Sequence, residues 1–174
     1  MKIYKESELE FSFPDDLMFE ELDRQGVTLP VGMSLVDLVI ENENEILLIE
    51  IKDPSNSEAP EQARRHYERR IRGGGLITEE LVPKVRDSYT YLHLMERDRK
   101  QFKYIVLLCL DAFPNEKALL IGFRDRLMTR ILKETDVPWK RRYIQDCAIM
   151  TLDIWNDIFK EWQVQRIPLS AATT

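Results

Sequence analysis

Short apolar runs separated by polar turns mark the central part of this chain. Leu35–Ile40 and Ile46–Lys52 are runs of mainly branched apolar residues, and the polar segment Glu41–Asn44 separates them. Two such runs joined by a few turn residues predict a β-hairpin. Because both runs are apolar on both faces, we expect both strands to lie inside a sheet that is covered on each side.

Helical periodicity and helix punctuation mark the segments on either side of this hairpin. Asp15–Gln25 follows Pro14 and precedes Gly26, so it is predicted as the first helix. Glu61–Arg72 has helical apolar spacing and is predicted to end at Gly73–Gly75. The other predicted elements are a short strand at Val27–Val31, a helix bearing Val85, Tyr89, Leu92 and Met95, a strand at Tyr104–Leu110, a helix at Asn115–Glu134, a strand at Cys147–Thr151 and a helix at Leu152–Trp162. This order predicts an α/β fold with a central mixed β-sheet flanked by helices on both faces.

Length and composition set the scale of this fold. A chain of 174 residues with 44% hydrophobic residues is long enough for one domain with one core. We expect that domain to span residues 1–169 and residues 170–174 to form a loose tail. Cys109 and Cys147 stand singly in apolar surroundings, which indicates buried free thiols rather than a zinc site. No apolar run is long enough for a membrane span and no secretory signal is evident, so a cytoplasmic location is expected.

The charge is unevenly distributed along the chain. The formal net charge is −6, which argues against a protein that coats nucleic acid by bulk attraction. Residues 1–61 contain 4 Lys/Arg and 16 Asp/Glu, whereas residues 62–174 contain 21 Lys/Arg and 15 Asp/Glu. An acidic first third is therefore followed by a basic remainder, and the two parts call for separate interpretation.

Three charged residues interrupt the two strands of the predicted hairpin. Glu50 and Lys52 are two residues apart, so they project to the same face of their strand. The turn can bring Asp37, on the partner strand, opposite them. Unpaired buried charges are costly, so a shared role is expected. Two carboxylates and one ammonium group suit a hard divalent cation such as Mg²⁺, with the lysine free to act on water or phosphate. The alternative is a core salt bridge between Lys52 and one of the carboxylates.

The spacing of these residues resembles a known family. The motif consists of Asp37, twelve intervening residues and Glu50-Ile51-Lys52, and it lies in two apolar strands. It resembles the active-site motif of the PD-(D/E)XK nuclease superfamily. Val36 stands where the family motif has proline. The resemblance covers roughly residues 15–110 and implies a restriction-endonuclease-like core, made of a helix, a three-stranded meander, a helix and a further strand.

The same resemblance implies roles for the residues of the motif. Asp37 and Glu50 would bind Mg²⁺, with Mn²⁺ as an alternative, and the main-chain carbonyl of Ile51 would be a further ligand. Lys52 would assist the attacking water. Hydrolysis of DNA by this superfamily usually leaves a 5′-phosphate.

In the family, the first helix often supplies one more carboxylate. On an ideal helix Glu21 lies beside the side formed by Met18 and Leu22, whereas Glu20 points nearly the opposite way. We therefore expect Glu21 to be the additional metal ligand. A solvated acidic face is the alternative.

An arginine face on the helix after Lys52 is the candidate surface for nucleic acid. Arg64, Arg65, Arg69 and Arg72 lie within about 140° of arc on an ideal helix. Such a face could follow a phosphate backbone. A solvated helix face, partly neutralised by Glu68, is the alternative reading.

Two classes of function follow from these observations. The first is a Mg²⁺-dependent nuclease that acts on DNA, with RNA left open as a substrate. A homodimer would supply the two sites needed to cut both strands of a duplex. The second is a catalytically inactive binding or assembly module with a nuclease-like fold. A third reading, an unrelated α/β protein, would place the carboxylates of Asp37 and Glu50 on opposite faces of the sheet.

Overall fold

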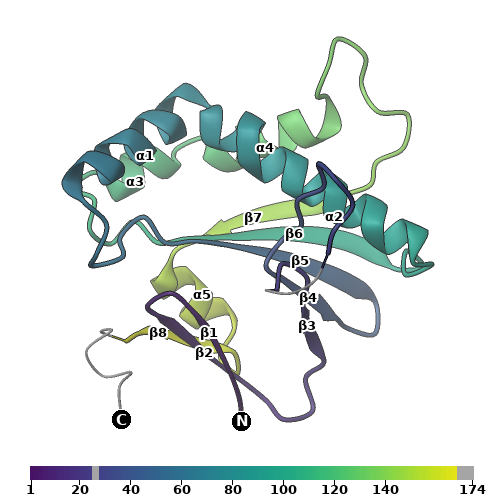
Figure 1. Ribbon diagram of the computed structural model, residues 1–174, viewed down its shortest axis with the longest axis horizontal. Coiled ribbons are helices and arrows are strands. Elements are labelled where there is room, and N and C mark those ends of the chain that lie inside the picture. The colour runs from purple at the N-terminus through teal and green to yellow at the C-terminus, as the bar shows by residue number, and fades with distance from the viewer. Residues whose placement is uncertain (25–27, 168–174) are drawn as a thin grey trace.

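A five-stranded mixed sheet runs through the centre of the molecule (Figure 1). The structure is a computed structural model that describes residues 1–24 and 28–167. The strands in spatial order are β3 (Phe19–Glu21), β4 (Leu38–Glu41), β5 (Glu45–Lys52), β6 (Gln101–Leu108) and β7 (Asp146–Met150). Strands β3, β4 and β5 pair antiparallel, whereas β5, β6 and β7 pair parallel. The predicted hairpin is therefore confirmed as β4–β5, although its first strand begins at Leu38 rather than Leu35.

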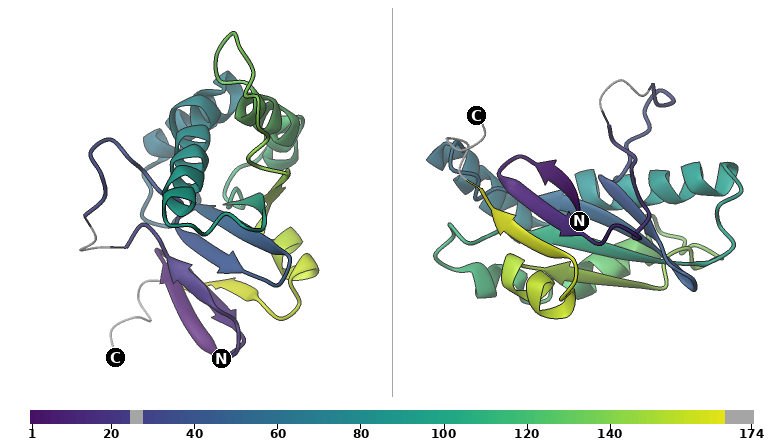
Figure 2. Two further views of the ribbon diagram at one scale, coloured as in Figure 1. Left: turned by 90° about the vertical axis from the view of Figure 1, so that its right-hand side faces the viewer. Right: turned by 90° about the horizontal axis from the view of Figure 1, so that it is seen from below.

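Both faces of this sheet are covered, but by different kinds of structure. One face carries the helices α1 (Glu61–Gly73), η1 (Ile77–Leu81), α2 (Val82–Leu94), α3 (Glu116–Leu120) and α4 (Phe123–Leu132) (Figure 1). The other face carries α5 (Leu152–Ile158) and a small antiparallel sheet of β1 (Lys2–Glu6), β2 (Leu9–Phe13) and β8 (Gln163–Arg166) (Figure 2). The prediction of a mixed sheet with helices on both faces is thus confirmed. None of the helices within the described ranges is long and apolar enough to cross a bilayer.

Alternation along β5 divides the core into two parts. Ile46 and Leu48 pack under the helices, whereas Leu47 and Ile49 pack toward α5 and the small sheet. All four side chains are at most 4% exposed. Full burial of such a side chain is worth about 1.5–3 kcal/mol, so burial on both faces holds β5 firmly in the sheet.

The predicted helix at residues 15–25 is wrong. Within the described residues this segment contains a turn and then β3, in which Phe19 pairs with Ile40 of β4. The apolar spacing was compatible with a helix, but pairing to the edge of β4 satisfies the backbone of this segment and buries Phe19 against the small sheet. The predicted strand at residues 27–31 is also absent from residues 28–31, and Val27 lies outside the described residues.

Three further differences concern the second half of the chain and its termini. The predicted helix at residues 115–134 is two helices, because Gly122 adopts a left-handed conformation (φ 66°) between α3 and α4. The predicted helix at residues 152–162 ends at Ile158, and β8 follows it. The small sheet was not predicted. The predicted tail at residues 170–174 lies outside the described residues. Cys109 and Cys147 are buried free thiols, as expected.

Arg166 joins the small sheet to the end of β5. Its guanidinium group forms ion pairs with Glu8 (3.1 Å), Asp53 (2.8 Å) and Asp111 (2.9 Å). The Glu8 side chain is only 1% exposed, and Arg166 is its charged partner beside the hydrogen bonds that it accepts from Ser57. We expect Arg166→Met to lower the free energy of unfolding by about 2 kcal/mol, because a buried acceptor loses a charged partner.

Urea denaturation of this variant would measure the effect. Arg124→Met is the matched control, since Arg124 also bridges two carboxylates but is half exposed. A loss of stability no larger than that of the control would contradict the structural role of Arg166.

Candidate functional site

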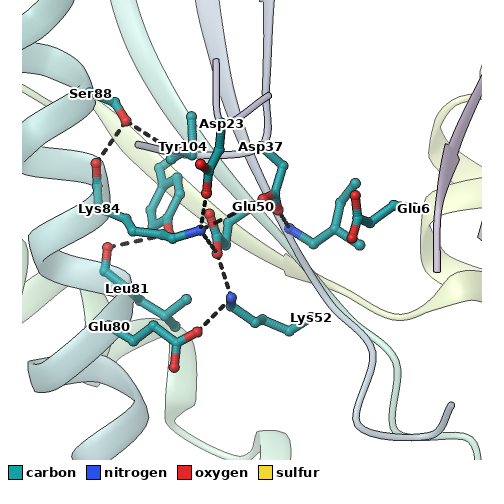
Figure 3. A network of polar contacts seen from close by, with 12 residues as sticks. Glu6, Asp23, Asp37, Glu50, Lys52, Glu80, Leu81, Lys84, Ser88 and Tyr104 are labelled. Atoms are coloured by element: carbon teal, nitrogen blue, oxygen red, sulfur yellow. Dashed lines mark hydrogen bonds and ion pairs between the residues drawn. The ribbon is translucent and has the colours of Figure 1, made fainter. Parts of the chain in front are cut away.

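The three predicted residues Asp37, Glu50 and Lys52 come together under the helical layer (Figure 3). Glu50 and Lys52 lie at the end of β5 and point to the same side as Ile46 and Leu48. Asp37 directly precedes β4, one residue before the Leu38–Ile49 pair. Chain reversal between the two strands therefore places Asp37 opposite Glu50, as alternation predicts.

Glu50 is the centre of the cluster. Its side chain is fully buried, and its Oε1 atom lies 2.7 Å from Lys52 Nζ and 2.9 Å from Lys84 Nζ. Lys84 belongs to the first turn of α2 and was not predicted as a site residue. The salt bridge considered as an alternative is thus present between Glu50 and Lys52, but it is one contact within a larger network.

Asp37 is tied to the same network from the other strand. Its Oδ2 atom accepts a 2.6 Å hydrogen bond from the main-chain N–H of Ile51, and its Oδ1 atom lies 3.6 Å from Lys84 Nζ. The carboxylates of Asp37 and Glu50 therefore share one ammonium group. An arrangement with the two carboxylates on opposite faces of the sheet is excluded by this shared contact.

A second pair of side chains, Glu80 and Arg70, extends the network toward α1. Glu80 Oε1 lies 2.5 Å from Lys52 Nζ, and Glu80 Oε2 lies 2.9 Å from Arg70. Glu80 belongs to η1, a π-helical turn that continues directly into α2. Glu80 and Lys84 are therefore four residues apart on one helical face. In the sequence, only the four-residue spacing of Glu80 and Lys84 connects these two residues. Charged residues with this spacing usually lie on a solvated helix face, so the spacing does not indicate a buried site.

Burial shapes the protonation of these groups. Burial, together with the charge of Asp37, raises the pKa of Glu50 to about 7, even though Lys52 and Lys84 oppose this shift. Burial likewise raises the pKa of Asp37. Burial alone would lower the pKa of Lys52, but the charges of Glu50 and Glu80 outweigh it and raise that pKa. The pKa of Lys84 is raised in the same way by Glu50 and Asp37. Both ammonium groups are thus charged at neutral pH.

The donor atoms can be tested against a metal ion. Both carboxylate oxygens of Glu50 are buried without a hydrogen-bond partner among the described residues, and Oε1 has only its ion pairs with the two lysines. Carboxylates are also the ligands that Mg²⁺ prefers. Within residues 1–24 and 28–167, however, no group of three or more His, Cys, Asp or Glu side chains has a metal-binding arrangement. A cation at this place would have Asp37 and Glu50 as its side-chain ligands and would need water to complete its coordination.

Comparison with known proteins adds no family to this picture. No family model, curated protein or solved structure matches the chain. The resemblance to PD-(D/E)XK nucleases therefore depends on the sequence motif of Asp37, Glu50 and Lys52.

The two ligands implied only by the resemblance lie in different surroundings. Glu21, on β3, pairs with Leu38 of β4, so it projects to the face opposite Lys84. The carboxylate from this segment that reaches the cluster is Asp23, 3.5 Å from Lys84 Nζ. Ile51 lies between Glu50 and Lys52 on β5, and its N–H donates a hydrogen bond to Asp37. The geometry thus favours Asp23 over Glu21 as the additional acid near the site.

The predicted arginine face of α1 is partly neutralised by its own helix. Arg65 pairs with Glu61 (2.5 Å) and Arg72 pairs with Glu68 (2.8 Å). Arg64 donates a 3.0 Å hydrogen bond to the carbonyl of Asn56. Among the described residues Arg69 forms no ion pair, so it is the freest of the four. Arg70, which was not predicted, is the α1 arginine that contacts the cluster, through Glu80.

Proposed function

We propose that this chain is a metal-dependent nuclease that hydrolyses phosphodiester bonds of DNA. The observation that carries the proposal is the fully buried Glu50, which shares a cluster with Asp37 and two lysines and whose two oxygens have no hydrogen-bond partner among the described residues. Buried ion pairs add little stability and are often replaceable by apolar residues. Groups with strongly shifted pKa values that gather in this way are typical of functional sites.

The proposed roles follow the chemistry of each group. Asp37 and Glu50 would hold Mg²⁺ or Mn²⁺, which when bound supplies a nucleophilic water and neutralises developing charge. Lys52 stays protonated because its pKa is raised, so it would act by orienting water or stabilising charge on the phosphate, and not by accepting a proton. Glu80 would position Lys52 through their 2.5 Å contact.

The surroundings of the site support a phosphate-containing polymer as substrate. The antiparallel strands β3, β4 and β5 form a three-stranded meander that is followed by α1 and β6, an order compatible with a restriction-endonuclease-like core. Among the described residues no helix precedes this meander. Arg64, Arg65, Arg69 and Arg72 on α1 are the proposed contacts to the DNA backbone. RNA is the alternative substrate, and a homodimer is the proposed assembly for double-strand cleavage.

Cleavage assays on Asp37→Asn would test this function. We expect the wild-type protein to cleave DNA with Mg²⁺ or Mn²⁺ but not with EDTA. Loss of one ligand should reduce the rate about a hundredfold. Asp146→Asn is the matched control. Asp146 is the first residue of β7, accepts a hydrogen bond from the main-chain N–H of Cys147 and forms an ion pair with Arg124. Equal cleavage by wild type and Asp37→Asn would contradict the assignment.

One observation favours the second candidate function, an inactive binding or assembly module. Lys84 already contacts both carboxylates, and a permanent lysine there would make a metal unnecessary. Calorimetry with millimolar Mn²⁺ separates the two candidates. Binding that is lost in Glu50→Gln supports the nuclease, and no binding to the wild type supports the module.

A further inference from the structure

Lys84 lies where the two candidate metal ligands converge. Its Nζ atom is 2.9 Å from Glu50, 3.6 Å from Asp37 and 3.5 Å from Asp23, and its side chain is 12% exposed. Figure 3 shows this ammonium group between the three carboxylates. It is the only basic group among the described residues that contacts both Asp37 and Glu50.

A single ammonium group balances these carboxylates incompletely. Glu50 and Asp37 both lie in a poorly solvated region, and Lys52 is shared with Glu80 on the other side. A divalent cation would neutralise the Asp37–Glu50 pair more fully than Lys84 does. A divalent cation and an ammonium group cannot occupy the same space, and they repel each other strongly at contact distance.

We propose that Lys84 is a built-in counterion that occupies the cation position between Asp37 and Glu50 in the metal-free protein and moves to Asp23 when a divalent cation binds. This inference rests on the metal site of the proposed function and adds a competitor to it. Its consequence is that Lys84 stabilises the empty site and weakens metal binding, so that the site fills only above a threshold concentration of metal.

Asp23 is suited to receive the displaced lysine. It lies on the segment after β3, its side chain is 47% exposed, and it already lies within 4 Å of the ammonium group. Lysine has a flexible four-carbon stem, so its head group can change partner without movement of α2. The solvated carboxylate of Asp23 can therefore hold the ammonium group outside the coordination shell.

Lys84→Met tests the competition, because methionine keeps much of the stem and removes the charge. With Mn²⁺ alone as the probe, calorimetry should show binding at least about tenfold tighter than in the wild type. In EDTA the same variant should melt roughly 5 °C lower, because Asp37 loses its ammonium partner and Glu50 keeps only Lys52. Lys103→Met is the matched control, since Lys103 pairs with Glu45 at the opposite end of β5 and should leave Mn²⁺ affinity unchanged.

Asp23→Asn gives a second test in a variant that leaves the buried cluster intact. We expect it to weaken Mn²⁺ binding several-fold in the wild-type background and to change nothing in the Lys84→Met background. An equal weakening in both backgrounds would mean that Asp23 acts on the metal directly, which would overturn the proposed movement of Lys84.

The outcomes separate this inference from the nuclease function. Tighter Mn²⁺ binding by Lys84→Met without DNA cleavage by either protein supports the counterion and contradicts the nuclease. DNA cleavage by the wild type, together with equal or weaker Mn²⁺ binding in Lys84→Met, supports the nuclease function and overturns the counterion role of Lys84. Absence of Mn²⁺ binding in both proteins overturns the counterion as well, since Lys84 would then hold no cation position.

Discussion

Replacing Lys52 by methionine should slow Mg²⁺-dependent DNA cleavage about a thousandfold while metal still binds. Lys52, the last residue of β5, lies between two carboxylates, Glu50 at 2.7 Å and Glu80 at 2.5 Å. Its proposed task is to stabilise charge or orient water during the reaction, and removal of such a group typically costs a factor of 10²–10⁴. Single-turnover cleavage of a labelled duplex would measure the loss.

Two controls define the role of Lys52. Lys52→Arg keeps the positive charge and should recover part of the cleavage rate that Lys52→Met loses. If Lys52 were purely structural, the cleavage rates of the two variants would simply follow their free energies of unfolding. Mn²⁺ titration of Lys52→Met should still show binding, because the carboxylates of Asp37 and Glu50 remain. Cleavage at the wild-type rate by Lys52→Met would remove Lys52 from the proposed mechanism.

The metal-free protein should become less stable as the pH rises from about 4.5 to about 7. Burial raises the pKa of Glu50 to about 7, so in this window the folded state holds a proton that the unfolded state has released. A raised carboxyl pKa therefore contributes stability at low pH that is lost through pH 7. The contribution of Glu50 amounts to about 3 kcal/mol, and the raised pKa of Asp37 acts in the same direction.

Urea denaturation in EDTA across this pH range would measure the effect. Glu50→Gln should remove the part of the pH dependence that Glu50 contributes, because its amide does not titrate. Glu8→Gln is the control: Glu8 is also buried, but hydrogen bonds from Ser57 hold its pKa below the ordinary value, so this variant should retain the slope. A wild-type stability that is constant or rising from pH 5 to 7.5 would contradict the prediction.

The hairpin and its charged residues can be predicted from the sequence because both depend on local patterns. Apolar runs around a polar turn indicate two strands, and alternation alone places Glu50 and Lys52 on one face. The position of Asp37 opposite Glu50 follows once the hairpin is accepted. The buried charges then stand out, since the rest of both strands is apolar.

The remainder of the site depends on contacts that local patterns do not carry. Lys84 and Glu80 look like ordinary residues of a solvated helix until η1 and α2 pack over β5. Glu21 was chosen on a helical projection, and the formation of β3 in its place brings Asp23 to the cluster instead. In contrast, the small sheet had a visible signal: Leu9, Phe11 and Phe13 alternate with polar residues, as strand residues do.

The pairing of β2 with β8 has a consequence for how the chain folds during synthesis. Glu10 and Gln165, which meet across these strands, are 155 positions apart. Until β8 leaves the ribosome, β2 keeps one edge without a partner, and Val164 is missing from the apolar layer that it shares with Phe11. Contacts between such distant segments form slowly, and unpaired edges promote association between chains. The nascent protein is therefore expected to be most prone to association between chains before β8 closes the small sheet.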